Sequence, residues 1–244
     1  MDIFLKSVPH KEFDPKAFVG DKNIPQALCN FVLALALVYN DFKFYSVNYK
    51  DLLDSRPEGK LERNSIWGEY EGIKLHLVRL HIAFAHELFK LIQENRELLE
   101  NAFLKEVVRM LDRRARESWK TLVEAALMEE TAARRSNPLF MIRNKIIFHY
   151  DTKELFSGYQ TGFFKEQKVL QDACLSEGSN LEDSRFYFAD LAVEGYLKKK
   201  LGLDADIFFS SLGEIIRDIN MALHHIVIGF IQRRNFAWRI PRSK

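Results

Sequence analysis

The segment MIRNKIIFHYD, residues 141–151, places three polar side chains in an otherwise apolar stretch: Arg143, Asn144 and His149. An imidazole titrates near neutral pH and can accept or donate a proton, and a guanidinium offers fixed N–H donors to phosphate oxygens. The residue types therefore suit acid–base chemistry on a phosphate. They also suit the polar positions of a core helix, so the two interpretations have to be compared.

Helix geometry decides whether these side chains can meet. Asn137 and Pro138 are typical of a helix N-cap and first turn, so we expect a helix that begins at Pro138. On an ideal wheel Arg143 falls inside the apolar arc, where a guanidinium requires a partner or a polar cavity. His149 lies about 120° away and roughly 9 Å along the axis. Convergence requires a helix break, a π-bulge or a second copy of the chain across a two-fold axis.

The motif resembles that of a known family. Arg143, Asn144 and His149 in RNKIIFH resemble the HEPN superfamily signature, an Arg and a polar residue followed by a His, and in particular that of abortive-infection type HEPN proteins. The resemblance implies a dimeric helical bundle that acts as a metal-independent endoribonuclease and leaves a 2′,3′-cyclic phosphate. His149 would be the general acid or base, Arg143 would stabilise charge on the phosphorane, and Asn144 would hold phosphate or orient the histidine.

The resemblance also implies partners. It places the chain in a bacterial defence or toxin-type system, as a homodimer with RNA as its substrate, no cofactor, and an antitoxin or nucleotidyltransferase as a partner protein. In one toxin subset a tyrosine two positions after the histidine is modified by the nucleotidyltransferase. Here that position is Asp151 and the tyrosine is Tyr150, so the chain departs from that pattern.

An alternative class is a non-catalytic helical module for RNA binding or protein interaction, as many members of that superfamily are. In this interpretation Arg143 is a structural ion pair with a carboxylate such as Glu87, and His149 caps its helix. A closed salt bridge inside one subunit would favour this class, whereas a basic cleft on a two-fold axis would favour cleavage. The sequence leaves both open.

Basic residues concentrate around the motif. Residues 105–145 contain ten Lys and Arg against six Asp and Glu. We take Lys145, Arg134 and Arg135 as candidate RNA-binding residues, with Arg109 and Arg113 in the same stretch. The tail from Arg233 mixes basic and aromatic residues, which could hold single-stranded RNA by phosphate contact and stacking. Solvated helix faces give the same pattern.

Composition limits the remaining classes. The 36 Lys and Arg nearly balance 34 Asp and Glu, and the two cysteines, Cys29 and Cys174, have no metal or disulfide spacing. His76, His81 and His86 are five residues apart, which is not the i, i+4 spacing of zinc ligands, so we expect helix-flank positions and no metal site. The longest apolar run is about half of what a bilayer crossing needs. We expect a cytoplasmic protein without a membrane partner.

The spacing of apolar residues predicts an all-α, up-and-down helical bundle in one domain, residues 1–244. We expect an N-terminal arm over residues 1–24 and core helices over 25–151. One of these helices should have an apolar stripe of Ile73, Leu77, Leu80, Phe84, Leu88 and Leu91. The stretch 73–137 lacks Gly and Pro, yet it must fold back near 94–101 and 112–115, because a single helix would be roughly 100 Å long. Gly158, Gly162 and Gly178 indicate chain breaks, so residues 152–202 are predicted as an irregular insertion that could form a short β-hairpin. Residues 203–238 are predicted as the final helix, with an apolar stripe of Leu212, Ile215, Ile219, Ala222 and Ile226, and 239–244 as a basic tail.

Overall fold

The computed structural model describes residues 11–59, 64–128, 152–165, 173–177, 179–180, 184–201 and 205–234. The predicted all-α bundle is confirmed, since these residues form seven α-helices and no β-strand. One core runs through the bundle, with Phe31, Phe42, Ile82, Leu88 and Phe230 among its fully buried side chains.

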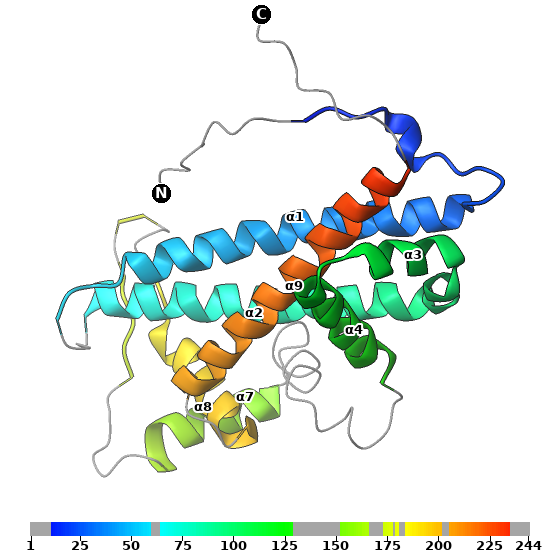
Figure 1. The fold of residues 1–244 in the computed structure, drawn as a ribbon. Coiled ribbons are helices and arrows are strands. Elements are labelled where there is room, and N and C mark those ends of the chain that lie inside the picture. Colours follow the sequence, from blue (N-terminus) through cyan, green and yellow to red (C-terminus); the bar gives the residue numbers. More distant parts are fainter. Residues whose placement is uncertain are drawn as a thin grey trace, which may run out of the picture.

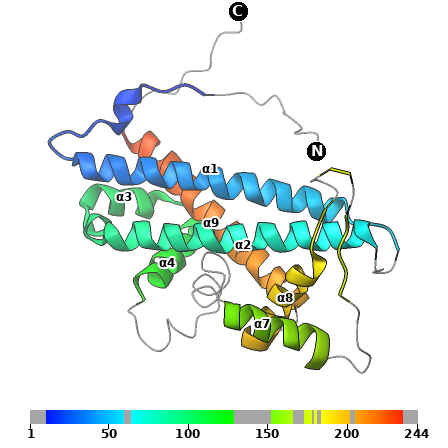
Figure 2. The same cartoon turned by 180° about the vertical axis from the view of Figure 1, so that it is seen from behind.

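Two long helices form the base of the bundle. α1 (Gln26–Asp54) and α2 (Ser65–Glu94) lie side by side in both views (Figures 1 and 2). α2 begins where the Asn64 side chain accepts the N–H of Trp67 at 2.9 Å. Its most deeply buried residues are shifted around the helix from the predicted stripe. Ile73 is exposed, whereas Leu75, Val78 and Ile82 are buried, because α2 packs against α1 and α4 together.

The predicted reversals after α2 are confirmed. A 3-10 helix (Arg96–Glu100) separates α2 from α3 (Ala102–Met110), and α4 (Arg113–Leu127) begins shortly after α3 ends. Asn101 accepts the N–H of Phe103, and Asp112 accepts the N–H of Ala115, both at 2.9 Å. Asn and Asp side chains therefore start the new helices in a stretch that has neither Gly nor Pro.

The last helix, α9 (Ala205–Arg233), crosses α1 and α2 obliquely and packs on α1, α3 and α4 (Figure 1). It confirms the predicted final helix over the described residues. Ile215, expected in its buried stripe, is exposed, and Ile216 is buried instead. From Ile219 to Phe230 the apolar face of α9 lies in the core, so α9 joins elements that are far apart in sequence.

The predicted irregular insertion is largely helical, which corrects that prediction. α7 (Thr152–Gln160) continues into a π-helical turn (Thr161–Lys165), and α8 (Tyr187–Leu201) packs along it. Of the expected hairpin only an isolated antiparallel bridge between Ser176 and Arg185 is present in the described residues. Gly158 suggested a chain break, but with Gly195 it permits close helix packing. A Cβ at Gly195 would lie 2.2 Å from the carbonyl oxygen of Gly158.

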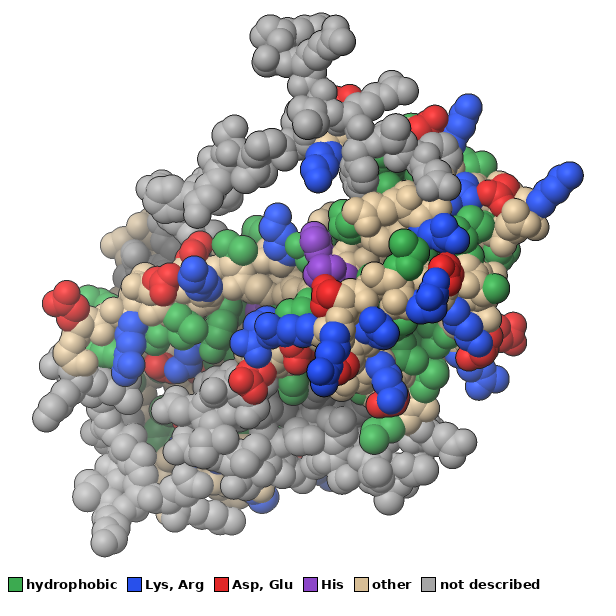
Figure 3. All heavy atoms as spheres, viewed as in Figure 1, with side chains coloured by type: hydrophobic (Ala, Val, Ile, Leu, Met, Phe, Trp, Pro, Cys, Tyr) green, Lys and Arg blue, Asp and Glu red, His purple; other side chains and the backbone are tan. Residues whose placement is uncertain are grey.

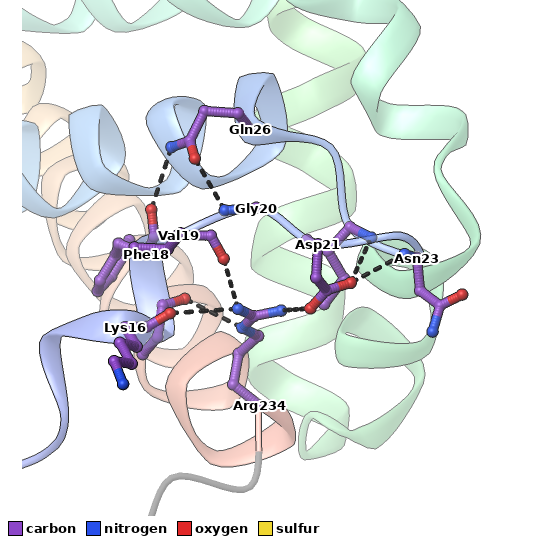
Figure 4. Close-up of polar contacts among 10 residues, drawn as sticks. Lys16, Phe18, Val19, Gly20, Asp21, Asn23, Gln26 and Arg234 are labelled. Atoms are coloured by element: carbon purple, nitrogen blue, oxygen red, sulfur yellow. Dashed lines mark hydrogen bonds and ion pairs between the residues drawn. The ribbon is translucent and has the colours of Figure 1, made fainter.

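The described part of the N-terminal arm packs on the bundle. A 3-10 helix (Pro15–Phe18) buries Ala17, and the ring of Phe18 lies 5.6 Å from that of Phe230. Arg234, just after α9, donates to the carbonyl oxygens of Lys16, Ala17 and Val19 and pairs with Asp21 (Figure 4). The arm is thus fastened to the end of the last helix.

By length and composition α1 would suffice to cross a membrane, and it is the one such helix among the described residues. Core helices pass the same test. Leu28, Val32 and Leu35 of α1 are fully buried against the rest of the bundle.

Candidate functional site

The predicted motif lies outside the described residues. Arg143, Asn144 and His149 fall in residues 129–151, as do the candidate RNA-binding residues Lys145, Arg134 and Arg135. The geometry of the motif therefore stays a prediction, and so does an ion pair between Arg143 and Glu87. The described part of the basic stretch lies on α3 and α4, directly before that segment.

Helices α3 and α4 carry a surface that we call the basic face. Residues 102–127 hold more Lys and Arg than Asp and Glu. The space-filling view shows Lys and Arg side chains gathered over this region and over α9, with histidines where α9 crosses α1 (Figure 3). The basic face consists of Lys105, Arg109, Arg113, Arg114, Arg116 and Lys120.

Glutamates on the same helices offset part of this charge. Arg109 donates from Nε and Nη2 to Glu106 at 2.9 and 2.8 Å, and Arg113 donates to Glu117 at 2.9 Å. The hydrogen bond from Arg109 lowers the pKa of Glu106, and the bond to Glu117 raises the pKa of Arg113. Because these pairs are exposed, each contributes little to folding. They leave a surface that is positive but mixed in sign.

Two adjacent histidines of α9 border the basic face. The Nδ1 of His225 lies 3.7 Å from Oδ2 of Asp112, the N-cap of α4, and the ring of His224 lies 5.2 Å from that of His225. Partial desolvation, followed by the electrostatic effects of the neighbouring His225 and Lys43, lowers the pKa of His224. His224 is therefore mostly neutral at pH 7. Adjacent residues on a helix point in different directions, and nothing in the sequence signals that Asp112, from a distant segment, approaches His225.

This arrangement can hold a polyanion more readily than it can carry out a reaction. Exposed guanidinium and ammonium groups attract phosphates at long range, and Arg can bind them through paired donors. Among the described residues no three His, Cys, Asp or Glu side chains gather as a metal site would require. The basic face directly precedes, in sequence, the segment that carries the motif.

His81 does not lie at a helix flank, which corrects the expectation for this residue. Its side chain is 2 % exposed, and Nδ1 lies 2.9 Å from the carbonyl oxygen of Leu77. The rings of Phe42, Tyr45 and Tyr49 surround it at 6.1–6.3 Å. Nε2 is buried without a hydrogen-bond partner among the described residues. Burial lowers the pKa of His81, so it is a neutral core residue.

In comparisons with protein-family models, with curated proteins and with solved structures, nothing matches this chain. A function for it is therefore inferred from the motif and from the residues around it.

Proposed function

We propose that this chain is an RNA-directed protein of a bacterial defence or toxin-type system, resembling the HEPN superfamily, that cleaves RNA without a metal ion. Arg143 and Asn144 would bind the scissile phosphate, and His149 would move the proton. The active form would be a cytoplasmic homodimer in which both copies contribute to one cleft. The observation that carries the proposal is the spacing of Arg, Asn and His in RNKIIFH.

The basic face supports the proposal as a place for the RNA strand. α4 ends at Leu127, and Arg143 follows within the next segment of the chain, so a strand held along α4 would approach the start of that segment. Phosphate contacts of this kind supply affinity without sequence selection. In this proposal Arg113 and Arg114 bind the RNA backbone and position the strand, and the motif residues cleave it.

One observation favours the alternative, a non-catalytic RNA-binding or protein-interaction module. Arg109 and Arg113 are already paired with glutamates of their own helices, as on an ordinary solvated surface. Such a module would retain the bundle and lack cleavage. An antitoxin or a nucleotidyltransferase would then be its candidate protein partner.

The test is cleavage of a labelled RNA mixture in excess EDTA by the wild type and by His149→Ala and Arg143→Ala, with product ends analysed for cyclic phosphate. The matched control is His76→Ala, which removes an exposed histidine of α2. We expect cleavage by the wild type and the control and none by the motif variants. Equal cleavage by wild type, control and motif variants would assign the activity elsewhere. RNA binding without cleavage, weakened in Arg113→Glu/Arg114→Glu, would establish the binding module.

A further inference from the structure

The outer face of α1 carries an apolar stripe that faces away from the core. Leu33, Leu37, Phe44 and Val47 are 54, 64, 52 and 50 % exposed. On a helical wheel they occupy an arc about 80° wide, nearly opposite the arc of Leu28, Leu35 and Phe42 that packs inside the bundle. α1 therefore has two apolar faces, and the described part of the bundle covers one of them.

The spacing along this stripe is that of a helix–helix seam. Leu33, Leu37, Asn40, Phe44 and Val47 follow one another at intervals of four, three, four and three. This alternation keeps one stripe facing a partner helix over successive turns. From Leu33 to Val47 the stripe rises about 21 Å. It contains no charged residue, and Asp51 follows at the next position, where the apolar run ends.

Two features of the stripe fit a second copy of the same chain. Asn40 lies in its middle, and an amide that both donates and accepts can pair with itself across a two-fold axis, as single Asn residues do in paired helices. The two edges also carry opposite charge, with Asp41 on one edge and Lys43 and Lys50 on the other. A two-fold axis parallel to the helices places unlike edges together.

We infer that two copies of this chain associate through the outer face of α1, with Leu37 and Phe44 at the centre of the contact. A membrane surface is the competing occupant, because apolar helix faces also bind lipid. The stripe lacks the cationic border on both sides that would favour anionic lipid, since Asp41 occupies one edge. This inference shares the expectation of a homodimer with the proposed function, but it is argued from the described residues of α1 and not from the motif.

The test is the mass of the protein in solution, measured by sedimentation over a range of concentrations. We expect a dimer for the wild type and a monomer for Leu37→Glu, with the dissociation constant raised about 100-fold or more because each contact would bury a carboxylate. Met110→Glu, which alters a similarly exposed apolar residue of α3, should remain dimeric. Circular dichroism and urea unfolding should show that both variants are folded.

A cross-link gives a second, independent measurement. In a Cys174→Ser background, which removes the exposed native thiol, Leu37→Cys should form a disulfide between copies and Met110→Cys should not. A monomeric wild type would overturn the inference. So would a dimer that persists in Leu37→Glu, or binding of a monomer to neutral lipid vesicles that Leu37→Glu abolishes. A monomeric wild type would also contradict the homodimeric active form of the proposed function. A dimer that persists in Leu37→Glu, with cleavage retained in EDTA, would overturn this inference alone.

Discussion

Arg234 and Asp21 form an ion pair that fastens the N-terminal arm to the end of the last helix (Figure 4). The Arg234 side chain is 6 % exposed, and its donors also reach three carbonyl oxygens of the arm at 2.6–3.2 Å. A planar guanidinium can serve several acceptors at once, which a lysine ammonium cannot do with the same geometry. Arg234 is therefore the centre of the contact between the two ends of the described chain.

Replacement of Arg234 by Ala should lower the free energy of unfolding by about 2–3 kcal/mol, because its acceptors lose a charged donor. Arg234→Lys should recover only part of this loss. The control is Arg233→Ala, the neighbouring residue, whose contact with Glu106 is long at 3.9 Å and exposed, and it should cost about 0.5 kcal/mol or less. Urea unfolding measures all of these variants. Equal effects at positions 233 and 234 would contradict this account.

The lowered pKa of Asp21 predicts that the free energy of unfolding decreases at acid pH. Its pKa is lowered first by the N–H of Asn23 and then by Arg234. Because the folded protein holds the carboxylate in its charged form, this contribution is complete above the unfolded pKa, about 4, and is lost as pH falls through the lower folded value. Unfolding measured between about pH 5 and pH 2 should show a shallower decline for Asp21→Asn than for the wild type. Identical pH profiles would exclude the contribution.

The lowered pKa of His81 predicts that the stability of the folded protein also depends on pH in a range nearer neutrality. Burial lowers its pKa in the folded protein, so the unfolded chain binds more protons as pH falls through about 6.5. The stability that His81 contributes should therefore be complete above that pH and decline below it. His81→Phe, which suits the surrounding aromatic rings, should reduce this decline more than His224→Asn does, since His224 is much more exposed. Thermal unfolding at about pH 7.5 and about pH 5.5 gives the comparison.

Substitution by Ala should have opposite effects on stability at two glycines, Gly158 in the α7–α8 contact and Gly213 in α9. A Cβ at Gly158 would lie 2.0 Å from the carbonyl oxygen of Ala192, so Gly158→Ala must separate the two helices and should cost at least about 2 kcal/mol. A Cβ at Gly213, within α9, would meet no other segment of the described chain within 4 Å, so Gly213→Ala should stabilise the helix by about 0.5–1 kcal/mol. Urea unfolding of both variants measures the difference in sign.

The sequence predicts the helices better than it predicts their packing. The starts of α3 and α4 follow from local signals, since Asn101 and Asp112 cap the helices that come after them. Gly158 misleads, because the same residue type that breaks an isolated helix allows two helices to touch. Whether a glycine ends a helix or allows close packing of two helices depends on the partner segment, which local spacing does not reveal.

For the candidate site, too, the sequence identifies residue types but not how distant segments come together. The spacing of Arg143 and His149 identifies residue types that can act on phosphate. Whether the two side chains meet depends on a helix break, a π-bulge or a second copy of the chain, and local spacing reveals none of these. The approach of His225 to Asp112 is likewise invisible in the sequence, since the two residues belong to separate segments that pack only in the folded bundle. The exposed stripe of α1 becomes apparent only once its opposite face is known to be buried.

The position of α9 has a consequence for synthesis. α1 and α4 leave the ribosome well before α9, yet both pack against it, and Ile226 and Phe230 complete the core they share. Until Phe230 has emerged, the apolar surfaces that α9 covers stay open to solvent or to chaperones. The core is therefore completed only once Phe230 has emerged, and a chain that ends prematurely before α9 should be degraded rather than accumulate as a shorter folded form.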